Sequence, residues 1–112
     1  MQSDKSLAKR DAEMKAEREQ LKHKYKPLFD QMAQLLFEAD PMGINFESNT
    51  DEYDPEVGTI LPRLEGAHSA DDVQTIVHEE FCRWFGPEEA GAREQYAAVS
   101  QQIWSAWCDF KA

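Results

Sequence analysis

The 112-residue chain has no apolar run near the roughly 20 residues that a membrane-spanning helix requires. Its first 26 residues are charged where a secretory signal peptide would carry an apolar stretch, so we expect a cytoplasmic protein without a membrane partner. Only two cysteines are present, Cys82 and Cys108, which are too few for a disulfide framework; free thiols are favoured, and a disulfide between the two is the alternative. The composition therefore argues against membrane proteins and disulfide-stabilised secreted domains.

Glycine and proline are also scarce, with five of each, and no glycine-rich phosphate-binding pattern occurs. No serine or cysteine lies in a glycine elbow or beside a sequence-local base. His78 and Cys82 stand four residues apart on one helix face, but a zinc site needs three or four ligands. The carboxylates between Glu47 and Glu56 lack the spacing of a calcium loop. We therefore expect no enzymatic activity, no metal and no cofactor.

What the chain does have is acidic charge, and this charge is unevenly distributed. Residues 1–26 contain eight Lys/Arg and five Asp/Glu, a balance of +3, whereas residues 27–112 contain four and seventeen, a balance of −13. An anionic body repels nucleic acid and accelerates encounter with cationic proteins. We therefore expect a protein partner and no nucleic acid, and we divide the chain into a charged helical arm, 1–26, and an acidic helical domain, 27–112.

Apolar residues recur at intervals of three and four through most of the chain. This period predicts an all-α bundle of four to five helices, with a long irregular loop after the first long helix. In the arm, only half of the helical seam is apolar. Pro27 interrupts the arm helix or begins the next one, which we expect to end near Ala39. The sequence D-P-E at 54–56 predicts a helix start with Asp54 as its cap.

The remaining helices are marked by their own start and stop signals. Ser69 and Asp72 predict a capping box, and Gly86 before Pro87 ends the helix that follows. A last helix is expected to begin near residue 88 or 92 and to run to residue 110. The predicted core shares the helical period and consists of Leu35, Leu36, Ile60, Leu61, Ile76, Val77, Phe81, Ile103 and Trp104.

One long connection, at residues 41–53, shows no helical period. Irregular segments of this length in compact domains often carry function. It contains Glu47, Asp51 and Glu52, with Tyr53 at its end, and we predict that these four residues form a protein-binding site. The carboxylates would speed encounter and pair with Lys or Arg, while Tyr53 would supply contact area.

Three motifs resemble a group of small helical bacterial proteins of unknown function. D-P-M-G-I at 40–44, D-E-Y-D-P-E at 51–56 and E-F-C-R-W-F-G at 80–86 are similar to a D-P-I-G-I turn, a D-E-Y-D-x-E helix start and an E-F-x-x-W-F-G helix end in that group. The resemblance covers residues 28 to 108 and implies a helical fold. Some such proteins are thought to be immunity partners of secreted bacterial toxins.

Acidity and this resemblance together favour a cytoplasmic immunity or inhibitor protein that occludes a basic toxin surface. The alternative is a structural or regulatory subunit that forms homo-oligomers, or docks on another protein, through its amphipathic N-terminal helix. An adjacent toxin gene would support the first hypothesis, and an unrelated operon would support the second.

Overall fold

The computed structural model describes residues 16–42 and 53–112. Every regular element in this part is a helix and no strand is present, which confirms the predicted all-α bundle. Residues 16–24 are helical. They are followed by α2 (Lys26–Ala39), α3 (Asp54–Ile60), the 3-10 helix η1 (Leu61–Gly66), α4 (Ala70–Phe85), the single turn α5 (Pro87–Ala90), the 3-10 helix η2 (Arg93–Tyr96) and α6 (Ala97–Lys111). None of the helices in the described ranges has the length and apolar character needed to cross a bilayer.

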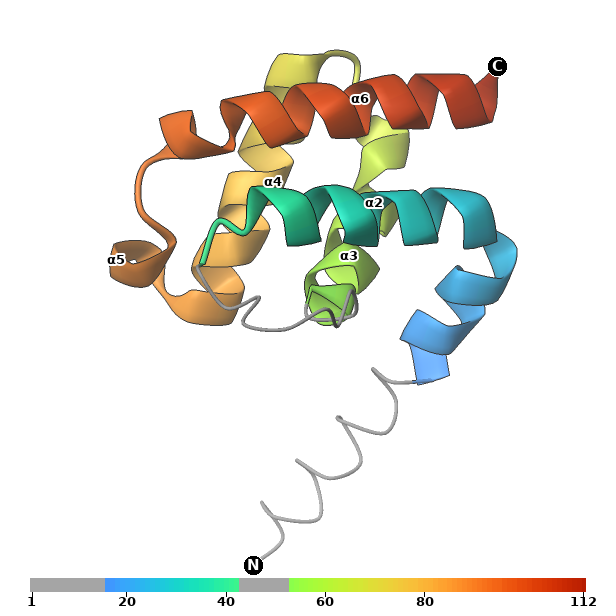
Figure 1. Cartoon of the computed structure of the whole chain (residues 1–112), viewed down its shortest axis with the longest axis horizontal. Coiled ribbons are helices and arrows are strands. Elements are labelled where there is room, and N and C mark those ends of the chain that lie inside the picture. Colours follow the sequence, from blue (N-terminus) through green and yellow to red (C-terminus); the bar gives the residue numbers. More distant parts are fainter. Residues whose placement is uncertain (1–15, 43–52) are drawn as a thin grey trace, which may run out of the picture.

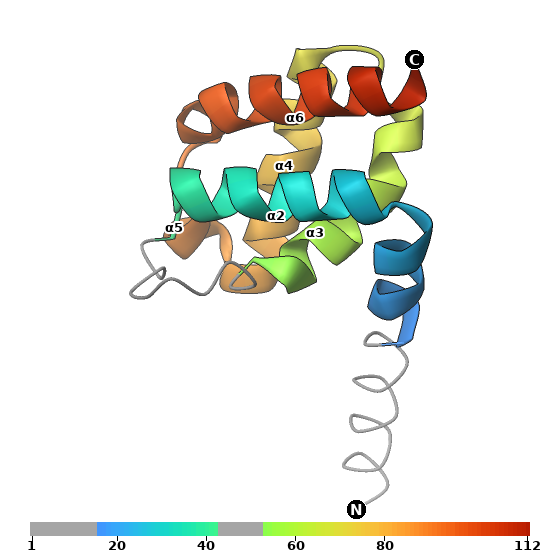
Figure 2. The ribbon, with the colours of Figure 1, turned by 45° about the vertical axis from the view of Figure 1, so that its right-hand side comes forward.

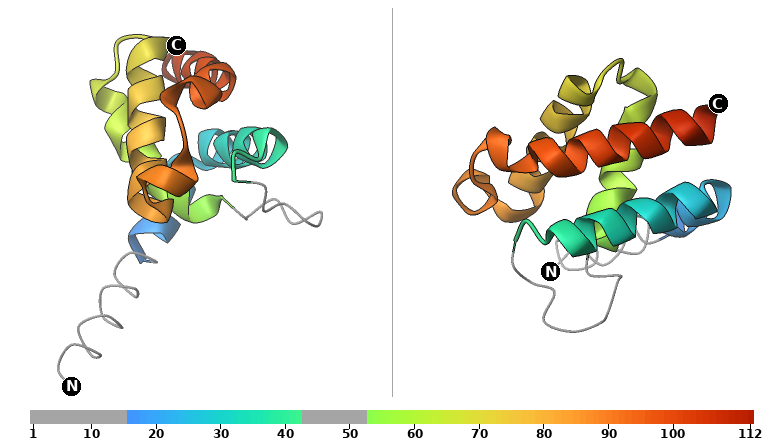
Figure 3. Two further views of the ribbon diagram at one scale, coloured as in Figure 1. Left: turned by 90° about the vertical axis from the view of Figure 1, so that its left-hand side faces the viewer. Right: turned by 45° about the horizontal axis from the view of Figure 1, so that its top comes forward.

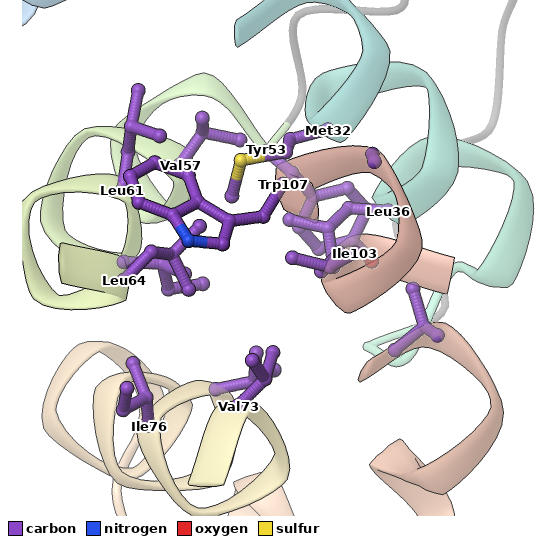
Figure 4. Packing of buried hydrophobic residues seen from close by; sticks show 14 of the residues in the cluster. Met32, Leu36, Tyr53, Val57, Leu61, Leu64, Val73, Ile76, Ile103 and Trp107 are labelled. Atoms are coloured by element: carbon purple, nitrogen blue, oxygen red, sulfur yellow. The ribbon is translucent and has the colours of Figure 1, made fainter. Parts of the chain in front are cut away.

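The helices form two crossed layers around one core. Figures 1 and 3 show α2 and α6 side by side, with α4 and the α3–η1 segment running across them. Among the predicted core residues, Leu36, Ile60, Leu61, Ile76, Val77, Phe81 and Ile103 are buried, whereas Leu35 and Trp104 are only half-buried at its edge. Figure 4 shows Leu36 of α2 and Ile103 of α6 within the same apolar cluster as Val57 and Leu61. The helical period therefore identified most of the core.

Local signals set both ends of α2 and the start of α4. Pro27 lies in the first turn of α2, where its missing N–H costs nothing, and the helix ends at Ala39 as predicted. The predicted capping box is present at Ser69, whose Oγ accepts a hydrogen bond from Asp72 N at 3.1 Å. The Asp72 carboxylate in turn accepts from His68 N at 2.9 Å. The first bond satisfies a backbone donor that the first turn of α4 leaves open, and the second satisfies the N–H of the residue before the cap.

Replacing Ser69 by alanine is expected to lower the free energy of unfolding by about 1 kcal/mol, because the Asp72 amide loses its acceptor at the helix start. Chemical denaturation followed by tryptophan fluorescence measures this loss. A glycine at the same position should cost only a few tenths of a kcal/mol. Equal losses for alanine and glycine would contradict the assignment of Ser69 as the cap.

Two predicted helix starts were wrong. Asp54 is not the cap of α3: Tyr53 takes the cap position without a side-chain hydrogen bond, and Asp54 is the first helical residue. After Ile60 the chain changes from α to 3-10 geometry, because Pro62 has no N–H to donate and its ring clashes with the preceding turn. The last helix begins at Ala97. Gly91 ends α5 with φ 78°, which interrupts the predicted continuous helix.

The described part of the arm packs on the body. Leu21 and Tyr25 are partly buried against the core, and the Tyr25 ring lies 5.6 Å from the ring of Phe110, measured between centroids. Figure 2 shows residues 16–24 turning away from α2 beside α3. The predicted boundary at residue 26 therefore separates two helices that both contact the core.

Candidate protein-binding surface

Of the four predicted binding residues, only Tyr53 lies in the described part of the chain; Glu47, Asp51 and Glu52 lie outside it. Tyr53 has no exposed surface, and its ring centroid lies 5.9 Å from that of Phe81 in the core. The prediction that Tyr53 supplies contact area for a partner was therefore wrong. An aromatic ring this large gains more from burial in the core than it would from a rim position.

The Tyr53 hydroxyl instead closes the base of the segment 43–52. It donates to Asp40 Oδ1 at 2.7 Å and accepts from Met42 N at 3.1 Å. Burial and the bond to Asp40 raise the pKa of this hydroxyl, so it remains a donor throughout the physiological range. Asp40 has a left-handed conformation at φ 45°, which aspartate tolerates better than most residues. We call these three residues the Tyr53 latch.

Ion pairs within the body use all of its basic residues. The four Lys/Arg of 27–112 each lie within 3.6 Å of a carboxylate, in the pairs Arg63–Glu79, Arg63–Glu80, Arg83–Glu80, Arg93–Asp71 and Lys111–Glu65. Glu79 binds Arg63 of η1 at 2.6 Å, although Arg83 stands four residues later on its own helix. The carboxylates that carry the excess negative charge of the body are therefore those outside these pairs.

Asp30, Glu38 and Asp109 are exposed and outside these pairs, and so are three carboxylates that lie close together, Glu88, Glu89 and Glu94. We call the latter three the α5–η2 carboxylates. No ion pair reaches them from the described ranges 16–42 and 53–112. They lie within seven consecutive residues, so their negative potentials add at one place on the surface.

Hydrogen bonds to α4 and within the turn fix the segment that carries these carboxylates. The carbonyl of Gly91 lies 2.9 Å from His78 Nε2, and the carbonyl of Ala90 accepts from the hydroxyl of Tyr96 and from Gln95 Nε2. At Gly91 a side chain would be strained by the positive φ, and its Cβ would lie 2.9 Å from the Gln95 amide. The turn is therefore specified by glycine and held in one conformation.

Arg93 ties the far side of the same segment to the start of α4. Its guanidinium binds the Asp71 carboxylate at 2.7 Å and the Thr75 hydroxyl at 3.0 Å, while its carbonyl accepts from Gln74 Nε2 at 2.9 Å. A surface fixed in this way loses little conformational freedom when a partner binds it.

His78 and Cys82 meet as the helical spacing predicted, with Nε2 and Sγ 3.5 Å apart. The same imidazole nitrogen faces the Gly91 carbonyl, and the ring lies 5.7 Å from the ring of Tyr96. Within the described residues, no group of three or more His, Cys, Asp or Glu side chains is placed to hold a metal ion. The arrangement accounts for His78 as a contact between α4 and the α5–η2 segment.

The Tyr53 latch and the α5–η2 carboxylates share one end of the bundle. Phe81 connects them, since its ring centroid lies 5.9 Å from that of Tyr53 and 5.2 Å from that of Tyr96. Figure 2 shows α5 at the same end as the C-terminus of α2. We call this region, from the Tyr53 latch to the α5–η2 carboxylates, the acidic end. The chain matches no protein-family model, no curated protein and no solved structure.

Proposed function

We propose that this chain is a protein-binding module that recognises a basic protein surface through its acidic end. One observation carries the proposal: every Lys/Arg of 27–112 is paired within the body, while Glu88, Glu89 and Glu94 are exposed, fixed and without an ion pair from the described residues. Carboxylates arranged in this way attract a cationic partner and leave charge for it to neutralise. Glu47, Asp51 and Glu52 are proposed to extend the same surface.

In its most concrete form, the proposal is a cytoplasmic immunity or inhibitor protein that covers a basic toxin surface. The role is steric and electrostatic and assigns no catalytic residue. Its support is the acidic end together with the three motifs that resemble the group containing such proteins.

A pair of matched charge reversals tests the proposal. The test variant is Glu88→Lys with Glu89→Lys, and the control is Asp30→Lys with Asp109→Lys, which makes the same change in net charge at exposed positions elsewhere. The partner is purified from native lysate on the wild-type chain, and its association rate constant with each variant is measured at two salt concentrations. We expect the test variant to slow association about tenfold at low salt and to weaken its salt dependence.

The control should slow association by no more than about threefold, because its charges lie outside the contact and act only through the long-range field. Equal slowing by both variants would show that net charge alone matters. In that case the acidic end is not the recognition surface.

A further inference from the structure

The first turn of α3 carries a buried carboxylate that its surroundings do not satisfy. Glu56 is only 4% exposed, and its Oε2 has no hydrogen-bond partner within 16–42 and 53–112. Burial raises the pKa of this side chain to about 7, which the nearby Arg18 guanidinium partly opposes and the Asp54 carboxylate reinforces. A buried polar atom without a partner is rare in folded proteins and calls for an explanation.

Two cations of the arm lie over this turn. Lys22 Nζ contacts Asp54 Oδ2 at 2.8 Å, and this hydrogen bond raises the pKa of Lys22. The methylene groups of Arg18 pass so close to Gly58 that a Cβ there would lie 3.3 Å from Arg18 Cγ and Cδ. Because Arg18 and Lys22 are four residues apart, both project from the same face of helix 16–24.

The attachment of helix 16–24 to the body is a narrow seam. Along this helix, Arg18, Leu21 and Lys22 are half-buried, while the other side chains are exposed. Lys22 retains 36% of its side-chain surface. A helix this short does not persist in water without tertiary contacts, and a seam with one aliphatic residue supplies few of them. Few tertiary contacts therefore hold helix 16–24 on the body.

Lys22 and Arg18 of the arm lie on the first turn of α3, where a basic partner would place its own Lys or Arg side chains. Its charge of +3 is opposite to that of the body, and its two contacting cations approach Asp54 and Glu56. We propose that the first turn of α3 binds a cationic helix of the partner, and that residues 16–24 occupy this site in cis as a competing ligand. This inference rests on the proposed function, and it specifies the partner as a helix with Lys or Arg side chains four residues apart.

A ligand tethered beside its own site is present at an effective concentration of the order of millimolar. A free cationic helix must therefore displace the arm before it reaches Asp54 and Glu56. Weakening the contacts of the arm with the α3 turn should therefore strengthen the binding of a free cationic helix. If the arm were instead part of the surface that binds the partner, the same change would weaken binding.

The test uses a fluorescein-labelled, acetylated peptide of residues 16–26 as the probe, titrated with the full-length chain. The variant Arg18→Gln with Lys22→Gln removes the two cationic groups that approach the α3 turn, the Lys22 ammonium on Asp54 and the Arg18 guanidinium near Glu56. The control, Lys24→Gln with Lys26→Gln, removes the same charge at exposed positions. We expect the first variant to bind the probe at least about tenfold more tightly than the wild type, and the control to stay within about twofold.

Adding Asp54→Asn to the first variant should reverse the gain, because the probe then loses the carboxylate that Lys22 contacts in cis. Equal affinities for the two double variants, or an Asp54→Asn change without effect, would overturn the inference. Hydrogen exchange in the wild type gives a readout that needs no variant. Probe at saturation should accelerate exchange of the amides of residues 20–24, and unchanged exchange would also overturn it.

The failure of this inference is distinguishable from failure of the proposed function. If the native partner responds to Glu88→Lys with Glu89→Lys but not to Arg18→Gln with Lys22→Gln, the acidic end stands and the competing arm is wrong. If the partner responds only to the arm variant, the α3 turn is the site and the α5–η2 carboxylates are not.

Discussion

Replacing Glu56 by glutamine is expected to raise the free energy of unfolding at pH 8 by about 2 kcal/mol and to flatten its pH dependence between pH 5 and 8. Burial raises the pKa of Glu56 to about 7 from an ordinary 4.5. The native state therefore holds a proton that the unfolded chain releases above pH 4.5. Stability from this group is fully present below pH 4.5 and is lost as the pH rises to about 7.

Ionisation of Glu56 destabilises the native state by up to about 3 kcal/mol. The expected gain from glutamine is smaller, because burying its amide also costs free energy. Urea denaturation at pH 5, 6, 7 and 8, followed by tryptophan fluorescence, measures the effect. Glu94→Gln is the control, since this residue is exposed and should leave the wild-type profile unchanged. Parallel wild-type and Glu56→Gln profiles would show that Glu56 does not titrate in this range.

Arg63→Met is expected to destabilise the fold by about 3 kcal/mol, because it leaves a buried charge on Glu80. Glu80 is only 3% exposed, and its Oε2 accepts a hydrogen bond from Arg63 Nη1 at 2.8 Å. The other nearby cation, Arg83, has its Nη1 3.6 Å from the same oxygen. Replacing both partners, as Arg63→Met with Glu80→Met, should recover most of the loss, because neither charge is then left without its partner.

A double-mutant cycle in chemical denaturation measures this coupling. The exposed pair Lys111–Glu65, at 3.3 Å, serves as the matched comparison, and Lys111→Met should cost less than about 1 kcal/mol. An additive Arg63–Glu80 cycle would mean that the ion pair does not stabilise the interface between η1 and α4.

Patterns that act over one helical turn were predictable from the sequence. Pro27, Ser69 and Gly86 mark helix ends through their own backbone and side-chain chemistry, and the structure places helix ends at all three. Core positions followed from the apolar period for the same reason. The two exceptions, Leu35 and Trp104, have the right spacing but lie at the edge of the apolar face.

Features that depend on distant partners were not predictable. Tyr53 lies among acidic residues, which suggested an exposed position, yet its burial depends on Phe81, far away in the sequence, and on Asp40 thirteen residues before it. Asp54 carries a valid local capping signal, but Lys22 of the arm binds its carboxylate. Glu56 is only 4% exposed, and its burial has no local signal in the sequence either.

The Tyr53 latch has an engineering consequence. The Tyr53 hydroxyl, just before α3, is hydrogen-bonded to Asp40 and Met42, just after α2. All atoms of the latch therefore lie outside 43–52. The hydrogen bonds of the latch therefore set no requirement on the sequence of 43–52, and doubling the length of a flexible connection costs only about 0.6 kcal/mol in closure entropy. A foreign peptide inserted within 43–52 would therefore leave both hydrogen bonds of the latch in place.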